Sequence, residues 1–258
     1  MLFNVSPDNG EYEVIIINDG SDEAETMLQL DIFGKKKYTV IDQANLGLAA
    51  ARNTGIAAAK GAYILFLDAD NCIEPDFLQQ AVKVLEAEPD VAVVYSDALY
   101  FGHKEGRWVV GEFNLQRLMI ANYIDACAMV RKSVFNELGG YDTAMKTIKS
   151  GWEDWDMWLR IAFSGKQFRY LPLIGFRYRV APESMIAGIN KSYEIRNRLT
   201  TYLHQKYPNQ LGHQHINELV IKRFKPHPFK FIIKLGMMAW FNKHYQKLVG
   251  KNKVIDSI

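Results

Sequence analysis

Apolar runs of strand length alternate with segments of helix length through the first half of the 258-residue chain. The predicted strands are residues 13–18, 37–41, 62–67 and 91–95. The predicted helices are residues 21–33, with Ser21 as the N-cap, 48–60 and 75–86. Strands that alternate with helices indicate βαβ units and a largely parallel sheet, so the expected fold class is α/β.

The second half is less regular. Its predicted strands are residues 126–131, 168–171 and 176–180. Its predicted helices are a short one ending at residues 139–140, then 152–164 and 184–207. Hydrophobic residues make up 48% of the chain, which is enough for a sizeable core.

The two cysteines, Cys72 and Cys127, cannot build a disulfide framework and suit a reducing compartment. Residues 1–10 lack the pattern of a secretory signal, and no run approaches the roughly 18 apolar residues of a membrane span. We therefore expect a cytoplasmic protein.

The charge of the chain is divided unevenly. Residues 222–253 contain nine Lys and Arg and no Asp or Glu, mixed with aromatic and aliphatic side chains. Such a basic amphipathic segment suits an anionic membrane surface, here the inner face of the membrane. The alternative is a helix packed on an acidic face of the body. Nucleic acid is not an expected partner, because no recognised motif accompanies the charge. The expected domains are residues 1–221 and 222–258.

Acidic residues follow two of the predicted strands. Asp19 ends the first, and Asp68 and Asp70 follow the third. Ligands of parallel sheets bind beyond the carboxyl ends of the strands, so these residues are expected to share one rim. Carboxylates together with substrate phosphates hold Mg²⁺ or Mn²⁺, which neutralise a departing phosphate. An isolated Asp-x-Asp is also common in solvated turns.

Five blocks of polar and small residues follow one another between residues 13 and 185. They are residues 17–21, 45–55, 61–70, 139–142 and 153–160. Together they resemble the blocks of family 2 glycosyltransferases. The resemblance implies a GT-A fold, a Rossmann-like and mostly parallel sheet flanked by helices, here with a C-terminal helical extension. It also implies an inverting, metal-assisted enzyme that uses a nucleotide sugar, most simply a UDP-sugar.

The resemblance implies a role for each matched residue on the donor side. Asp19 would accept a hydrogen bond from the base, the alternative being a bond that shapes its own turn. Arg52 would contact the diphosphate or the base edge, the alternative being a salt bridge. Asp70, with Asp68, would hold Mn²⁺ or Mg²⁺, and Asp68 would also contact the nucleotide sugar. Asp97 would contact the donor sugar or order its loop.

Asp154 is the predicted general base, because an inverting transfer needs a carboxylate to take the proton of the acceptor hydroxyl. Its neighbour Glu153, also expected at the nucleotide-sugar site, would raise the pKa of Asp154 by like-charge repulsion. Trp152 and Trp155 would supply apolar walls. The alternative is an acidic helix N-terminus that complements the helix dipole.

The chain departs from the family pattern at two places. Residues 1–11 are too few for the βα unit that usually comes first, so a central position in the sheet is expected to be left open or filled by another segment or subunit. Ala181 stands where many relatives have a metal-binding His, and Arg179 is the expected substitute for a phosphate contact.

Two functions from different classes follow. The first is transfer of a sugar to a hydroxyl of a glycan or lipid-linked glycan, as in polysaccharide biosynthesis at the cell envelope. The alternative is a truncated or degenerate relative that acts as an inactive fragment or partner subunit. A nucleotidyltransferase is disfavoured, because the chain lacks a Gly-rich, Arg-bearing N-terminal loop.

Overall fold

The structure is a computed structural model. It describes residues 2–5, 12–36, 38–146, 152–182 and 193–211. The chain divides into two compact units, Met1–Thr201 and Tyr202–Ile258. The expected boundary between residues 221 and 222, and the basic segment 222–253, lie outside the described residues.

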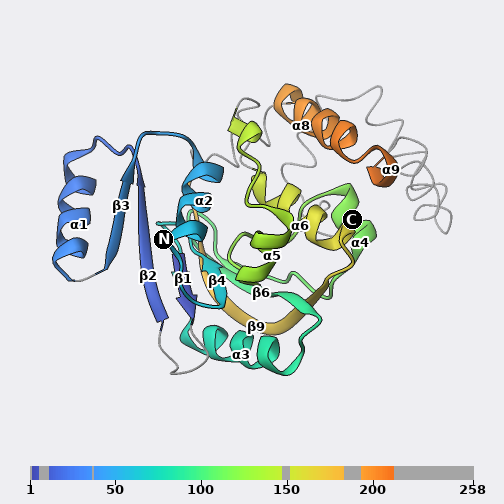
Figure 1. Ribbon diagram of the computed structural model, residues 1–258, viewed down its shortest axis with the longest axis horizontal. Coiled ribbons are helices and arrows are strands. Elements are labelled where there is room, and N and C mark those ends of the chain that lie inside the picture. Colours follow the sequence, from blue (N-terminus) through green and yellow to red (C-terminus); the bar gives the residue numbers. More distant parts are fainter. Residues whose placement is uncertain (1, 6–11, 37, 147–151, 183–192, 212–258) are drawn as a thin grey trace. The chain divides into compact units, whose positions relative to one another are not determined.

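The described strands form one mixed sheet in the order β3-β2-β1-β4-β8-β6-β9-β5, with β7 paired to β6 (Figure 1). The strands are β1 Leu2–Val5, β2 Tyr12–Asp19, β3 Thr39–Gln43, β4 Tyr63–Phe66, β5 Cys72–Ile73, β6 Val91–Gly102, β7 Gly106–Trp108, β8 Met129–Arg131 and β9 Gln167–Val180. β2, β3, β4, β6 and β9 run in one direction. The α/β fold class is confirmed, and antiparallel strands are inserted among the parallel ones.

The predicted helices occur in the predicted order. The described helices are α1 Ala24–Lys35, α2 Leu48–Ala58, α3 Pro75–Ala87, α4 Leu115–Ile120, α5 Lys132–Leu138, the 3-10 helix η1 Thr143–Lys146, α6 Glu153–Phe163, α8 Tyr193–Lys206 and α9 Pro208–Leu211. Of these, the three short helices α4, η1 and α9 were not predicted. The N-cap of α1 is Glu23, so the prediction of Ser21 is wrong. The Ser21 amide instead donates to the side chain of Asn18, which shapes the turn after β2. Of the helix predicted at 184–207, residues 184–192 are outside the described part.

The central position next to β2 is occupied by β1 of the same chain. Of the expected alternatives, the one in which another segment fills this position is confirmed, and the one in which it is left open is wrong. β1 pairs antiparallel with β2 on one side and with β4 on the other. Four residues in an extended conformation are enough for this, whereas a parallel strand would have needed a crossover of about a dozen residues or more. The sheet is therefore continuous between β2 and β4.

β9 is one strand where two were predicted. It pairs parallel with β6 along its length, but Ser96 lies opposite Leu171 while Asp97 lies opposite Ile174. Pro172 falls in this irregularity, where its missing N–H costs the sheet no ladder bond. The same pairing extends β6 to Gly102, well beyond its predicted end.

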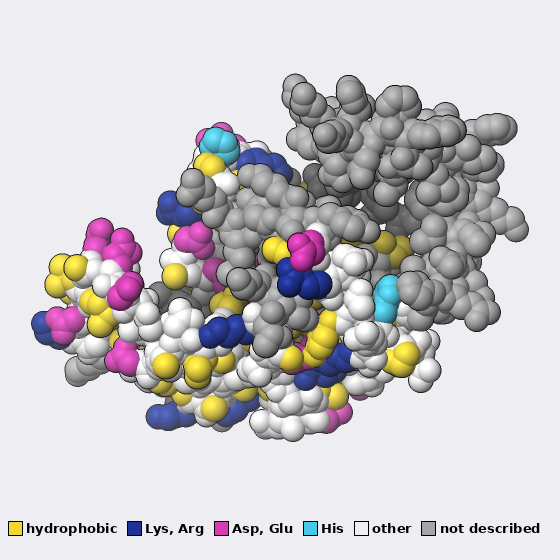
Figure 2. Space-filling view, turned by 90° about the horizontal axis from the view of Figure 1, so that it is seen from above, with side chains coloured by type: hydrophobic (Ala, Val, Ile, Leu, Met, Phe, Trp, Pro, Cys, Tyr) yellow, Lys and Arg dark blue, Asp and Glu magenta, His cyan; other side chains and the backbone are white. Residues whose placement is uncertain are grey.

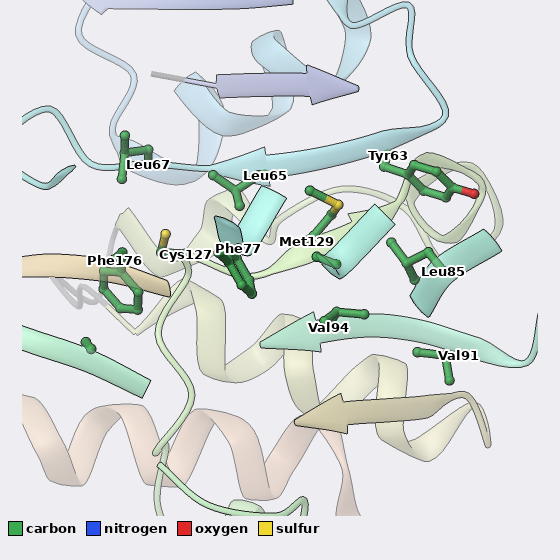
Figure 3. Packing of buried hydrophobic residues seen from close by; sticks show 12 residues of the cluster. Tyr63, Leu65, Leu67, Phe77, Leu85, Val91, Val94, Cys127, Met129 and Phe176 are labelled. Carbon is green, nitrogen blue, oxygen red and sulfur yellow. The ribbon is translucent and has the colours of Figure 1, made fainter. Parts of the chain in front are cut away.

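α3 covers one face of the sheet. Its buried side chains Phe77 and Leu85 pack against Leu65, Val94 and Phe176 from three strands (Figure 3). Pro75 at the first position suits the helix start, because its missing N–H is not needed there. This cluster fixes β4, β6 and β9 relative to one another and so positions the strand ends that carry the acidic residues.

α2, α5 and α6 lie on the other side of the sheet from α3 (Figure 1). Phe66 of β4 makes edge contacts with Phe135 of α5 and with Tyr141. Trp158 of α6 is fully buried, and its indole N–H donates to the Ile124 carbonyl at 3.0 Å. α6 is thereby held against the segment that leads into β8.

α1 lies beside β3 at the edge of the sheet and has no buried residue. Met27 is 44% exposed and Leu28 is 58% exposed. In Figure 2, hydrophobic side chains lie among acidic ones at the left, where α1 is found in Figure 1.

Within the part of the chain that the structure describes, no helix has both the length and the apolar character needed to cross a lipid bilayer.

Candidate active site

The ends of β2 and β4 bring the two acidic motifs to one rim, as expected. Both strands pair antiparallel with β1, so they run in the same direction. Asp19 is the last residue of β2, and Asp68 comes two residues after the end of β4. Between Asp68 and Asn71 the chain makes a turn, closed by a bond from the Asn71 amide to the Asp68 carbonyl at 3.1 Å.

Asp19 holds the loop between β3 and α2. One carboxylate oxygen accepts from the Gln43 side chain at 2.7 Å and from the Leu46 amide at 2.8 Å, and the other accepts from the Gly47 amide at 2.8 Å. Gly47 has a φ of 92°, which a residue with a side chain rarely adopts. Asp19 therefore shapes a turn, although in a neighbouring loop rather than its own. A contact with a base stays a prediction, and a carboxylate has about four lone-pair sites to serve both roles.

Arg52 of α2 is buried and joins two acids from different elements. It donates to Glu153 of α6 and, at 3.1 Å, to Asp68 after β4. Burial acts to lower its pKa, but the Glu153 and Asp68 carboxylates outweigh burial, and the pKa of Arg52 is raised. The salt-bridge alternative is thus observed for Arg52, with both described partners being acids of the site.

The ring of Tyr141 lies against the Arg52 guanidinium, whose Cζ is 5.2 Å from the ring centroid. Asn53 fixes this arrangement, because its side chain donates to the Tyr141 carbonyl at 2.8 Å and accepts from the Tyr141 amide at 2.6 Å. Gly140 makes room, since a Cβ there would lie 2.1 Å from the Asn53 side-chain oxygen. The second and fourth sequence blocks therefore meet in space.

Asp154, the predicted base, is half-buried at the start of α6. Its carboxylate accepts from the Asn122 side chain at 2.9 Å and from the Trp155 amide at 2.8 Å. Burial raises the pKa of Asp154 well above its ordinary value, and Glu153 raises it further, while Arg52 acts in the opposite direction. Like-charge repulsion from Glu153 therefore operates as predicted, but burial is the larger cause.

The two tryptophans of this block differ in burial. Trp155 is 3% exposed and its indole N–H donates to the Leu118 carbonyl, so it belongs to the core. Trp152 is half-buried and meets Trp155 edge to face. Arg160 pairs with the buried Asp156 at 2.9 Å, one turn apart on α6, which makes both structural.

Asp68, Glu153, Asp154 and Asp125 form an acidic cluster. Sequence reasoning missed Asp125. It lies in the loop before β8, and its carboxylate accepts from the Cys127 amide at 2.8 Å. Burial raises the pKa of Asp125 to about 7, with a further contribution from Asp68. A single carboxylate in a mostly apolar run has no periodicity or block pattern to reveal it, and only the fold places it near Asp68 and Glu153.

Asp70 is exposed in the turn after Asp68. Arg179 of β9 borders this turn, since its side chain donates to the Asp70 carbonyl at 3.2 Å and its amide donates to the Asn71 side chain at 2.9 Å. Arg179 is exposed beside this turn, and its contact with a phosphate stays a prediction.

The described residues contain no cluster of three or more His, Cys, Asp or Glu that would hold a metal ion by themselves. Mg²⁺ and Mn²⁺ bound with nucleotides need only one or two carboxylates, because phosphates and water complete the shell. Asp70 is exposed and the Asp68 side chain is 40% exposed, so the turn fits that kind of site.

Asp97 is fully buried and is saturated by its own surroundings. Its carboxylate accepts from two nitrogens of Arg107, from the Val110 amide and from the Tyr170 hydroxyl at distances of 2.7 to 3.0 Å. Of the two roles predicted for Asp97, ordering of the loop after β6 is the one that these contacts describe.

The first half of the chain matches a known protein family. Residues 2–139 match the family model described as "Glycosyl transferase family 2". The chain belongs to that family. The match contains Asp19, Arg52, Asp68, Asp70 and Asp125, while the predicted base Asp154 lies beyond it.

Several curated relatives are named as glycosyltransferases. An uncharacterised glycosyltransferase of Haemophilus influenzae is 32% identical over 59% of this chain and 53% of its own. YwdF, an uncharacterised glycosyltransferase of Bacillus subtilis, is 28% identical over 83% of this chain and 77% of its own. The chain thus spans about half the length of the first of these relatives.

The solved structures of TarS from S. aureus share the fold. The form in complex with UDP-GlcNAc has a TM-score of 0.58 and 15% identity, over 88% of this chain and 68% of that one. The form in complex with UDP has a TM-score of 0.55 and 18% identity, over 83% of this chain and 62% of that one. The family 2 member described here therefore has the GT-A fold.

Proposed function

We propose that the protein is an inverting glycosyltransferase that moves a sugar from a UDP-sugar to a hydroxyl group of a glycan or lipid-linked glycan. The observation that carries the proposal is Asp154, a half-buried carboxylate with a raised pKa. It follows Glu153, which shares Arg52 with Asp68. Family membership supports the reaction class. The TarS structures, solved with UDP-GlcNAc and with UDP, support a uridine nucleotide as the donor.

Asp154 suits the role of general base for three reasons. Asn122 and the Trp155 amide hold its carboxylate in one orientation. Its raised pKa makes the carboxylate a stronger proton acceptor than an ordinary aspartate. It remains partly exposed, as an acid that must reach an acceptor hydroxyl has to be.

The reaction is a single displacement. The acceptor oxygen attacks the anomeric carbon and forms the new C–O bond, while its proton passes to the Asp154 carboxylate. The C–O bond to the diphosphate breaks, and its electron pair leaves with the UDP oxygen. A divalent ion held by Asp70 and Asp68 would neutralise charge on that diphosphate. Arg52 keeps Asp68 and Glu153 in place during these steps.

The test is UDP binding to the purified chain by calorimetry with and without Mn²⁺, followed by donor hydrolysis or transfer. We expect metal-dependent UDP binding that Asp70→Ala abolishes. We expect Asp154→Asn to keep UDP binding and to lose activity by about two or more orders of magnitude, as removal of a general base does. Asp76→Asn, an exposed aspartate of α3, is the matched control.

Two results would contradict the proposal. Full activity of both variants would refute the assignment of base and metal ligands. Absence of UDP binding in either buffer would favour the alternative of an inactive fragment or partner subunit.

A further inference from the structure

Asp125 lies on a loop that connects the two sides of the site. On one side, Asn122 of this loop donates to Asp154, and the Ile124 carbonyl accepts from Trp158 of α6. On the other side, β8 begins at Met129, opposite Leu65 of β4. Because β8 and β4 are antiparallel, the loop arrives at the end of β4 from which Asp68 leaves.

The pKa shifts of neighbouring side chains agree with this location of Asp125. Burial raises the pKa of Tyr178, and the charges of Asp125, Asp68 and Asp70 add to the rise. Asp125 is also among the charges that raise the pKa of Asp154. Asp125 is therefore close both to the turn proposed to hold the donor diphosphate and to the proposed base.

The carboxylate of Asp125 can accept further hydrogen bonds. Its Oδ1 accepts from the Cys127 amide, and no described residue donates to its Oδ2. Among the described residues, the guanidinium of Arg52 pairs with Glu153 and Asp68 and not with Asp125. The side chain is only partly buried, so a ligand can reach it. A carboxylate oxygen accepts hydrogen bonds, and the hydroxyl groups of a sugar are donors of the kind that suit it.

In a direct displacement, the transferred sugar lies between the diphosphate and the acceptor oxygen. Asp68 and Asp70 mark the first of these places and Asp154 marks the second. The loop that carries Asp125 connects both places, through Asn122 to Asp154 and through β8 to the end of β4. We propose that Asp125 binds a hydroxyl group of the sugar being transferred and so selects among nucleotide-sugar donors. This inference rests on the proposed function.

The test compares UDP with UDP-GlcNAc, UDP-glucose and UDP-galactose by calorimetry in buffer with Mn²⁺, for wild type and Asp125→Asn. The asparagine oxygen can still accept from the Cys127 amide, so the loop keeps its bond. We expect UDP affinity to stay within about twofold. We expect the sugar nucleotide that wild type prefers to bind about tenfold to a hundredfold more weakly, as loss of a hydrogen bond to a charged group predicts.

Asp31→Asn is the matched control, because Asp31 lies on α1, which contributes no residue to this cluster. It should bind every probe as wild type does. Asp125→Ser, whose hydroxyl can accept from the same amide, is a second variant in case the asparagine disturbs folding. It should give the same split between UDP and the sugar nucleotide.

The outcomes separate the inference from the function. If wild type does not bind UDP, the proposed function fails. If wild type binds UDP, the function stands, and the inference is overturned by any of three results. These are equal loss of UDP and sugar nucleotide in the variants, unchanged binding of both in the variants, and a wild type that binds all three sugar nucleotides no better than UDP.

Discussion

Tyr141 shows how much a single buried atom can be worth. The residue is 3% exposed and its ring contacts Arg52, yet its hydroxyl has no hydrogen-bond partner among the described residues. A buried polar group without a partner costs about 1–3 kcal/mol. We expect Tyr141→Phe to raise the free energy of unfolding by about 1 kcal/mol, measured by urea denaturation.

Tyr123 is the matched control for this substitution. It is also buried, but its hydroxyl accepts from the Asn114 amide at 2.7 Å. Tyr123→Phe should therefore lower the free energy of unfolding by about 1 kcal/mol. Equal effects of the two substitutions would show that the Tyr141 hydroxyl is satisfied in solution.

Individual site residues differ in how well the sequence predicts them. Asp154 and Glu153 stand in a recognisable block, and their repulsion follows from adjacency alone. The buried ion pair of Arg52 with Glu153 depends on the packing of α2 against α6, 101 residues away in sequence, which no local pattern encodes. Asp125 is missed for the same reason.

α1 and α3 are helices of similar length with opposite relations to the core. α1 buries no residue, whereas Phe77, Ala81 and Leu85 of α3 are fully buried. We expect Leu85→Ala to lower the free energy of unfolding by about 2–5 kcal/mol, because it removes contacts and leaves a cavity. Leu28→Ala, the same change on α1, should cost less than about 0.5 kcal/mol.

Urea denaturation of both variants measures the difference. A cost at Leu28 comparable to that at Leu85 would mean that α1 is covered in solution, for instance by a second copy of the chain.

Strand boundaries were predicted less well than strand existence. β6 and β9 extend each other by pairing, and the irregularity opposite Asp97 accommodates Pro172. β1 is paired on both sides although no strand was predicted at residues 2–5. Long-range pairing decides both cases, and it acts between residues that a local pattern cannot relate.

The stability of the whole molecule should depend on pH through its acidic cluster. Burial raises the pKa of Asp125 to about 7 and raises that of Asp154 as well. An unfolded aspartate titrates near about 4, so between that pH and about 7 the folded chain binds more protons than the unfolded chain. The stability that these groups contribute is fully present below about pH 4. It is lost as the pH rises through the folded-state pKa, which is about 7 for Asp125.

We therefore expect Asp125→Asn to make the free energy of unfolding depend less steeply on pH than in wild type, when urea denaturation is followed between about pH 5 and about pH 8. Ordinary ion-paired carboxylates elsewhere make the stability change with pH in the opposite direction. They are the same in both proteins, so their effect cancels in the comparison. Parallel curves for the two proteins would contradict the raised pKa of Asp125.

At the scale of the molecule, the sequence predicted the fold class and the shared rim well. Both follow from alternating apolar runs and from the rule that ligands bind at carboxyl strand ends. It did not predict a sheet in which antiparallel strands separate β2 from β4 and β4 from β6, since strand order depends on pairing between distant segments.

Arg52 has a consequence for how this site can change in evolution. One guanidinium forms ion pairs both with Asp68, on the side proposed for the donor, and with Glu153, next to the proposed base. A substitution of either acid alters the charge balance felt by the other, so their effects should be epistatic. Residues in one salt-bridge network typically show interaction energies of about 0.5–3 kcal/mol in a double-mutant cycle. Donor preference and acceptor chemistry would then not evolve independently. Lineages that alter one should carry compensating substitutions that affect the other.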